Sequence, residues 1–248
     1  MAGEGRKATG DASTGSAGAP APAGSARPRR ARDSLNRSVI IDAAIRVAER
    51  DGLSGLTFQA LGTELGAHAT SIYRHFRDKD ELLLEVIDTL RDRSYGEALV
   101  STGDWREDVL LVAAQIRQHY LRYAPFAHDM SARSTHRRTE FLTVEFTLNA
   151  LEQAGLPPEE AALHLRLLGN YIRAMASFEA TVACMDPELR VKDRVQMQVD
   201  SQGLDPVEFP HLSQHASALL PLEDPRVFDL GLEAILDSIA ARADGGPR

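Results

Sequence analysis

Residues 57–83 have the pattern of two short helices joined by a tight glycine turn, and this pattern restricts the fold more than any other part of the chain. Thr57 can cap the first helix, because a threonine hydroxyl accepts a hydrogen bond from a backbone amide two or three residues later. The apolar residues that follow fall on one helical face: Phe58, Leu61 and Leu65. Gly66 suits the corner, since glycine adopts a positive φ without steric cost. The stretch therefore predicts a helix-turn-helix.

Two such short helices bury little apolar surface, so the unit needs a third helix. The segment from Asn36 to Asp51 supplies one, and Gly52 is placed to end it. Its apolar residues lie on one stripe: Ile40, Ala44, Val47 and Ala48.

In a helix-turn-helix the second helix enters the major groove with its N-terminal residues first. Small residues at 69–71 permit close approach, with Thr70 and Ser71 facing base edges. Tyr73, His75 and Lys79 come later and are expected to hold phosphates, which positions the protein without reading sequence. Asp78 is a plausible N-cap for a fourth helix, whose first amides and Lys79 would face one phosphate. The residues expected to contact DNA are Thr57, Gln59, His68, Ala69, Thr70, Ser71, Tyr73, Arg74, His75 and Lys79.

The alternative is that these are ordinary short helices of a bundle, with Tyr73 and Phe76 in its core. We favour DNA binding because the pattern covers a whole three-helix unit, although Phe76 itself is expected to be core.

The residues before this unit are of two kinds. Residues 1–26 consist almost wholly of Gly, Ala, Ser, Thr and Pro, a composition that predicts disorder. Residues 27–37 carry five Arg against one Asp, which predicts a flexible arm that contacts the minor groove or phosphates. The arm residues that we single out are Arg29, Arg30, Arg32 and Arg37. A solvated leader without a role is the alternative.

The sequence from Ile40 to Leu83, IIDAAIRVAERDGLSGLTFQALGTELGAHATSIYRHFRDKDELL, resembles the DNA-binding domain of the TetR family of transcriptional regulators. Its most specific part is SIYRHFRDKDELL. The resemblance implies a two-fold dimer, in which each subunit joins three DNA-binding helices to a larger helical domain. A small molecule bound in that larger domain usually releases the DNA.

The resemblance has two departures and a fainter continuation. Gly62 stands where the family usually has Ala, at a cost of about 1 kcal/mol in a helix interior, and Ala67 stands where Val is common. Residues 167–180 and 226–241 are similar, less specifically, to the ligand-binding domain of the tetracycline-repressor branch.

Charge is distributed unevenly along the 248 residues, which carry a net charge of −8. Residues 1–80 carry 12 Lys and Arg against 9 Asp and Glu, whereas residues 81–248 carry 16 against 27. A basic front and an acidic rear suit a protein that touches nucleic acid with one end.

A single cysteine, Cys184, excludes an intrachain disulfide and fits a reducing compartment. No signal peptide is visible, and no apolar run approaches the ~18 residues of a membrane helix. We therefore expect a cytoplasmic protein with no membrane partner.

After residue 80 the long segments are predicted to be helical. The expected helices cover residues 80–99, 105–123, 126–132, 136–154, 158–183, 207–220 and 225–242, while 184–206 is expected to be irregular. Two apolar stripes stand out: Leu165, Leu168, Ile172 and Met175, and then Phe228, Leu232, Ile235 and Ile239. These stripes either face their own core or form a four-helix dimer interface with a partner, and the resemblance favours the dimer.

Polar and aromatic residues recur on the helices of the larger domain, as an effector pocket requires. We select Asn149, Asn170 and Arg173 as the best polar candidates, because unpaired polar groups are costly inside a helical core. The full candidate set is His119, Tyr123, His128, Phe146, Asn149, Asn170 and Arg173. His211 and His215 have metal-ligand spacing, but without further ligands we interpret them as exposed histidines and expect no metal or cofactor.

These observations predict an all-α protein with a tail at 1–34, a helix-turn-helix domain at 35–80 and a helical ligand-binding and dimerisation domain at 81–248. The predicted function is a ligand-responsive repressor that binds a near-palindromic DNA operator as a homodimer and is released by a small-molecule effector. A ligand-independent accessory factor or activator is the alternative. No enzyme is expected, because no nucleophile elbow, phosphate loop, dinucleotide fingerprint or metalloprotease motif is present.

Overall fold

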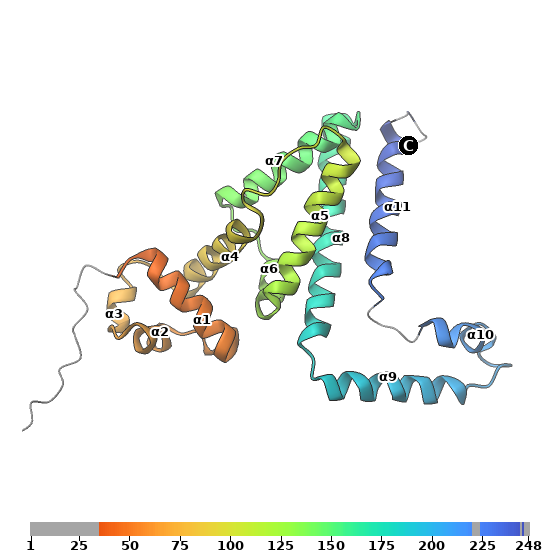
Figure 1. Cartoon of the computed structure of the whole chain (residues 1–248), viewed down its shortest axis with the longest axis horizontal. Helices are drawn as coiled ribbons and strands as arrows, with labels where there is room; N and C mark the ends of the chain where they lie inside the picture. Colours follow the sequence, from red (N-terminus) through yellow and green to blue (C-terminus); the bar gives the residue numbers. More distant parts are fainter. Residues whose placement is uncertain (1–34, 220–223, 244, 246–248) are drawn as a thin grey trace, which may run out of the picture. The chain divides into compact units, whose positions relative to one another are not determined.

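The computed structural model describes residues 35–219, 224–243 and 245, and all its regular elements are helices. The predicted tail and the arm residues Arg29, Arg30 and Arg32 lie outside the described residues. The prediction of an all-α fold is confirmed for the described part of the chain (Figure 1). No described helix is long and apolar enough to cross a membrane.

Four helices form the N-terminal region: α1 (Arg37–Gly55), α2 (Phe58–Leu65), α3 (Ala69–Ile72) and α4 (Lys79–Tyr95). The N-caps of α2 and α4 are as expected from the sequence, α1 has one as well, and α3 has no side-chain cap. The side chains of Asn36, Thr57 and Asp78 accept hydrogen bonds from the backbone amides three residues later, at 2.9, 3.1 and 2.8 Å. Gly52 interrupts α1 with a φ of 71°, a conformation that glycine adopts without a Cβ clash.

The larger region contains α5 (Trp105–Arg122), η1 (Ala124–Phe126), α6 (Ala127–Ala132), α7 (Arg138–Gln153) and α8 (Pro158–Cys184). After these come α9 (Pro187–Gln202), α10 (Pro210–Leu219) and α11 (Arg226–Ala243). α5 packs against both α7 and α8, and α11 lies along α8 (Figure 1). α4 contacts α1 on one side and α5 and α7 on the other, so it joins the two regions.

Two clusters of buried side chains hold these helices together. The first joins α1, α2 and α4 to Tyr120, Phe126 and Met130, so apolar packing is continuous between the N-terminal helices and the larger region. The second lies between α5, α7, α8 and α11.

The structure corrects the prediction that residues 184–206 are irregular, because α9 covers most of them. No residue of α9 is buried, and most of its side chains are polar. Val191, Val195 and Val199 do repeat at four-residue intervals along it, but they are exposed. Its start does carry local signals: Pro187 stands in the first turn, and the Asp186 side chain accepts from the amide of Glu188 at 2.8 Å.

The structure also decides between the two alternatives for the apolar stripes of α8 and α11. Leu168, Ile172, Phe228, Leu232 and Ile239 are buried within the single chain, in the second cluster. The partly buried members of the stripes, Leu165, Met175 and Ile235, pack against the same cluster. The expectation that these residues face a partner is therefore wrong, because they already face their own core.

Candidate nucleic-acid interface and effector cavity

The helix-turn-helix is held at a close approach of α2 to the turn before α3. Gly66 ends α2 in the left-handed conformation, with φ 63° and ψ 33°, as its place in the sequence predicts. A Cβ on Gly62 would lie 2.7 Å from the carbonyl oxygen of Ala67. The glycine that departs from the family pattern thus has a steric role here, in addition to its cost in helix propensity.

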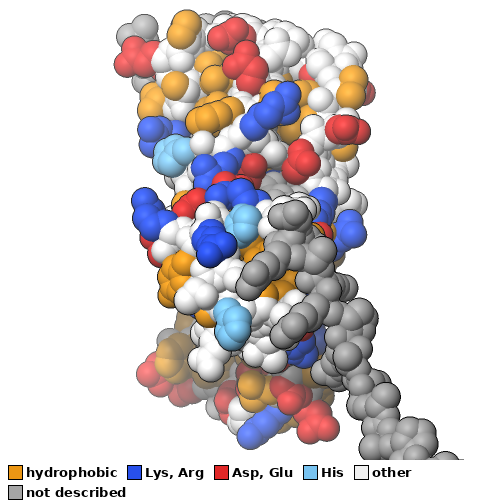
Figure 2. All heavy atoms as spheres, turned by 90° about the vertical axis from the view of Figure 1, so that its left-hand side faces the viewer, with side chains coloured by type: hydrophobic (Ala, Val, Ile, Leu, Met, Phe, Trp, Pro, Cys, Tyr) orange, Lys and Arg blue, Asp and Glu red, His pale blue; other side chains and the backbone are white. Residues whose placement is uncertain are grey.

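One side of α3 and of residues 73–76, which follow it, is anchored, and the other side is free. Ile72 and Phe76 are buried in the first cluster, whereas His68, Thr70, Tyr73 and Arg74 are exposed. Ala69, Ser71 and His75 are partly exposed, and Thr57 and Gln59 are exposed on the start of α2. Figure 2 shows basic and histidine side chains gathered across the middle of this face. The residues of this unit that are expected to contact DNA are therefore all exposed or partly exposed.

Two of these residues, Tyr73 and Lys79, also make contacts inside the protein. The ring of Tyr73 meets that of Phe58 edge to face, with centroids 4.6 Å apart, which leaves its hydroxyl at the surface. Lys79 donates from Nζ to the carbonyl oxygen of Leu53 at 2.8 Å, a bond that uses one of its three N–H groups.

Arg37 lies within the fold and not in a free arm. Its guanidinium sits 4.2 Å above the Phe76 ring and donates to the carbonyl oxygen of His75. It also bonds Glu81 and Glu85 at 3.1 and 3.0 Å. Its expected role in DNA contact stays a prediction, while its contacts show that it fixes the end of the helix-turn-helix.

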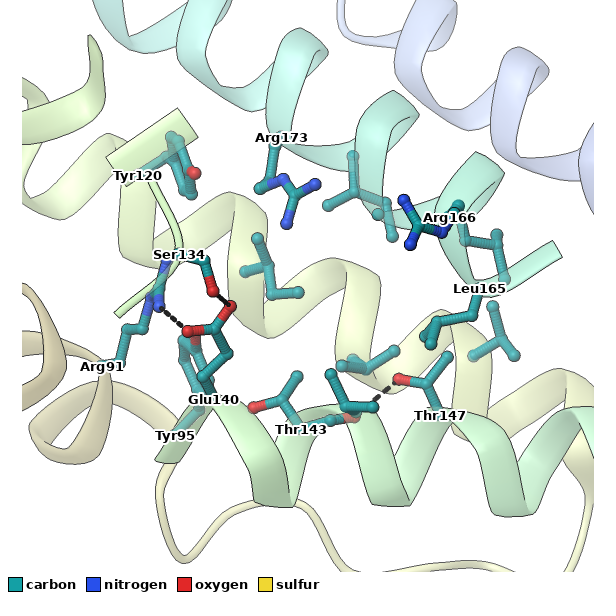
Figure 3. A pocket seen from close by; sticks show the side chains of 17 residues that line it. Arg91, Tyr95, Tyr120, Ser134, Glu140, Thr143, Thr147, Leu165, Arg166 and Arg173 are labelled. Atoms are coloured by element: carbon teal, nitrogen blue, oxygen red, sulfur yellow. Dashed lines mark hydrogen bonds and ion pairs between the residues drawn. The ribbon is translucent and has the colours of Figure 1, made fainter. Parts of the chain in front are cut away.

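A half-open cavity of about 450 Å³ is lined mainly by residues of α4, α5, α7 and α8 (Figure 3). Its walls are mainly apolar, and its charged residues are three arginines and one glutamate. The lining residues include Arg91, Tyr95, Val109, Val112, Tyr120, Ser134, Glu140, Thr143, Thr147, Arg166, Leu168, Ile172 and Arg173. The volume and the mainly apolar lining are typical of sites for small organic molecules.

Arg91 and Glu140 form a buried pair at one end of this cavity, with Nη1 and Oε2 3.7 Å apart. Arg91 is only 6% exposed and also donates to Thr135 Oγ1 and the carbonyl oxygen of Met130, both at 3.4 Å. Glu140 accepts from Ser134 Oγ and the Thr135 amide, both at 2.6 Å, and from the His136 amide at 2.9 Å. Burial acts to raise the pKa of Glu140, but these hydrogen bonds and the charge of Arg91 outweigh it and lower the pKa, so the carboxylate stays ionised.

Of the seven residues proposed from the sequence for the effector pocket, only Arg173 lines this cavity. Phe146 and Asn149 line a smaller hollow of about 340 Å³ next to Tyr95. His128 and Asn170 are exposed, and Asn170 accepts from Arg173 Nη2 at 3.0 Å.

His119 and Tyr123 are buried in an aromatic cluster with Tyr95 and Tyr120, the His119 ring lying 5.3 to 6.0 Å from the other three. His119 Nδ1 lies 2.8 Å from Ser94 Oγ, while Nε2 has no hydrogen-bond partner among the described residues. Burial, followed by the charges of Arg91 and Arg122, lowers the pKa of His119 to about 3, so the ring is neutral at physiological pH.

Sequence reasoning missed Arg91, Glu140 and Arg166. A signal existed for Arg91, because it follows Leu83 and Ile87 at four-residue intervals on an otherwise apolar helical face. Among the described residues no group of three His, Cys, Asp or Glu side chains is placed to hold a metal ion. Cys184 is exposed at the end of α8 and does not pack in the core.

The helix-turn-helix and the separate cavity of the larger region define the class: a helical DNA-binding protein with a hollow of small-molecule size. Residues 40–86 match the family model described as bacterial regulatory proteins of the tetR family. Residues 99–243 match the tetracyclin repressor-like C-terminal domain. The chain belongs to the TetR family of transcriptional regulators, a family without enzymatic activity.

Curated relatives carry the same kind of name. A transcriptional regulator of the helix-turn-helix type from Saccharopolyspora erythraea is 29% identical over 154 residues, which are 61% of this chain and 64% of that protein. A helix-turn-helix transcriptional repressor from Mycobacterium tuberculosis is 28% identical over 224 residues, covering 85% of this chain and 82% of the relative.

Solved structures agree with this assignment. ActR from Streptomyces coelicolor in complex with actinorhodin superposes with a TM-score of 0.76 at 26% identity, covering 84% of this chain and 97% of that chain. Apo ActR gives a TM-score of 0.72 at the same identity, covering 84% of this chain and 98% of ActR.

Proposed function

We propose that this protein is a homodimeric repressor that binds a near-palindromic operator and is released from it by a small organic molecule. The observation that carries the proposal is the exposed face of α3, whose opposite side is fixed by buried Ile72 and Phe76. A rigid support with free polar residues facing outward is what insertion into a major groove requires. Acting on chromosomal DNA agrees with the cytoplasmic location expected from the sequence.

The cavity favours an effector-responsive protein over a ligand-independent accessory factor. A purely architectural protein needs no cavity in its core. The mainly apolar space of about 450 Å³ in this protein is large enough for a small molecule to bind. The complex of ActR with actinorhodin supports the same reading, since this chain is similar to ActR over most of its length.

The direct test is binding of the purified protein to double-stranded DNA from upstream of its own coding region. We expect a salt-sensitive complex that outlasts competition by a scrambled fragment of equal length. Equal affinity for both fragments at every salt concentration would contradict sequence-specific regulation.

Dimerisation should use the outward faces of α8 and α11, since their inward stripes are occupied. Exposed apolar side chains remain on these faces: Leu163, Leu167 and Phe178 on α8, and Val227 and Leu230 on α11. Packed against the same pair of helices from a second copy, they would complete a four-helix interface.

Replacing Leu230, which is 73% exposed, by Glu should convert the dimer into a monomer. The dimer interface would then bury two carboxylates, one from each subunit, which opposes association. Because a monomer binds only one half-site, we expect operator affinity to fall roughly hundredfold or more. Sedimentation velocity and operator titration measure the two effects. V100E, on an exposed loop residue, is the matched control and should remain dimeric.

A chain of polar contacts leads from the cavity to the helix-turn-helix. Glu140 at the cavity holds the loop from Ser134 to His136. The next residue, Arg137, pairs with Glu85 of α4 at 2.9 Å, and Glu85 pairs with Arg37. Arg37 holds the backbone at His75. His136 in this loop has a φ of 51°, so the loop itself is held in a sparsely populated conformation. An effector that moves Glu140 or Arg91 would thus disturb contacts that end at α3.

Arg137→Gln should weaken operator binding although Arg137 lies in the larger region and is not among the residues expected to contact DNA. Loss of the Glu85 contact leaves Arg37 less firmly held, and we expect a change of roughly 3- to 30-fold in operator Kd, in the range of coupled sites. Arg138→Gln is the control, since it removes the same charge one residue later from an exposed position. Equal effects of the two substitutions on operator binding would count against the route.

A further inference from the structure

The cavity carries more positive than negative charge. Its lining includes the guanidinium groups of Arg91, Arg166 and Arg173 but only one carboxylate, that of Glu140. Glu140 is committed to Arg91 and to the loop amides. Within the described part of the chain, neither Arg166 nor Arg173 forms an ion pair, and the hydrogen bond of Arg173 goes to the neutral Asn170. Two positive charges beside an apolar space are thus without a counter-charge.

The hydroxyl of Tyr120 is a neutral hydrogen-bond donor on the side of the cavity where Arg173 lies. Tyr120 is 1% exposed, and its hydroxyl has no hydrogen-bond partner among the described residues. Burial raises the pKa of Tyr120, so the hydroxyl stays protonated and can donate. Figure 3 shows Arg173 directed from α8 into the cavity, with the Tyr120 hydroxyl on its side. A buried polar group without a partner is costly, and a ligand oxygen would satisfy it.

The remaining walls limit what else the ligand contains. Val109, Val112, Leu168 and Ile172 contribute aliphatic surface. A highly charged molecule would lose its hydration against such walls, whereas a ring system with one acidic group would not.

From these contacts we propose that the effector is an amphipathic organic anion, an apolar ring system with an acidic group that Arg173 and Tyr120 bind and that Arg166 attracts. This inference rests on the proposed function of the cavity as the effector site. It adds the charge and chemical class of the ligand.

Two fluorescent probes with the same ring skeleton test the charge requirement. 8-Anilino-1-naphthalenesulfonate carries one sulfonate, and N-phenyl-1-naphthylamine lacks it. The full-length protein should bind the sulfonate at least about tenfold more tightly, because a hydrogen bond to a charged group is stronger than one between neutral groups. Each probe is then added to the preformed complex with upstream DNA, and the sulfonate should release the DNA at lower concentration.

Variants locate the binding. Arg173→Gln should weaken sulfonate binding roughly tenfold and leave binding of the neutral probe within about twofold. Arg173→Lys keeps the charge and should retain most of the affinity. Tyr120→Phe should also weaken sulfonate binding while leaving the melting temperature of the free protein unchanged or higher, because it removes an unpaired buried hydroxyl. Arg138→Gln, outside the cavity, should change neither probe's affinity.

The outcomes separate the two proposals. If both probes bind equally and both release DNA, the effector site stands and the anion requirement is wrong. If the sulfonate binds tightly but R173Q binds it as well as the parent does, the arginine is not the receptor. If neither probe binds, the cavity is not a ligand site, and the effector role fails together with this inference.

Discussion

Replacing Thr70 by Glu should abolish operator binding while leaving the fold intact. Thr70 is exposed at the second position of α3. A carboxylate there lies near the helix N-terminus, where the helix dipole tolerates negative charge, and it displaces no buried group. In the proposed complex the same carboxylate would face phosphates and base edges of the major groove. Like-charge contacts of this kind cost several kcal/mol, and a dimer carries two of them, so we expect a loss of roughly 1000-fold or more.

Fluorescence anisotropy with labelled upstream DNA at low salt measures this loss. Gln198→Glu places the same charge on an exposed residue of α9 and should bind DNA like the parent. Both variants should melt within about two degrees of the parent protein. A T70E protein that is folded and binds the operator within about tenfold of the parent would show that α3 does not enter the groove.

Acidification between pH 6.5 and pH 5 should remove about 2 kcal/mol of stability through His119 alone. The pKa of this ring is lowered from 6.5 to about 3 in the folded protein, first by burial and then by the charges of Arg91 and Arg122. The unfolded chain therefore binds a proton in this interval that the folded chain does not. The contribution of neutral His119 to the free energy of unfolding is therefore present above pH 6.5 and is lost progressively as the pH falls toward 3.

Urea unfolding at pH 7, 6.5, 6, 5.5 and 5 measures this slope. In H119F, which keeps a ring among Tyr95, Tyr120 and Tyr123, the slope should be flatter by about 1.4 kcal/mol per pH unit. H128Q removes an exposed histidine and should follow the parent. Identical pH profiles for H119F and the parent would mean that His119 is solvated or already charged in the folded protein.

The helix-turn-helix could be predicted because its signals are local. Thr57, Gly66 and Asp78 act on backbone groups within a few residues, and the structure gives each the capping or turn geometry that its chemistry implies. The steric role of Gly62 could not be predicted, since it depends on how closely the carbonyl of Ala67 approaches.

The lining of the cavity could not be predicted from sequence patterns, because four helices that are distant in sequence contribute to it. Asn149 and Asn170 interrupt apolar stretches much as Arg173 does, yet only Arg173 lines the main cavity. A polar residue on an amphipathic helix marks either the solvent face or a lined space, and periodicity alone does not separate them. The same limit explains why the sequence leaves two alternatives for the stripes of α8 and α11, a partner or their own core, and why the structure favours the second.

The brevity of α3 has a consequence for selectivity. A helix of 4 residues offers few side chains to base edges. A chromosome presents about 10⁶ or more competing positions, and each mismatched base pair costs only about 1–3 kcal/mol. A single subunit with so small a contact surface would bind a great many near-matching sites. In the proposed dimer, discrimination comes from requiring two correctly spaced half-sites at once. On this view the subunit contact is as much a part of target choice as the residues that meet the bases.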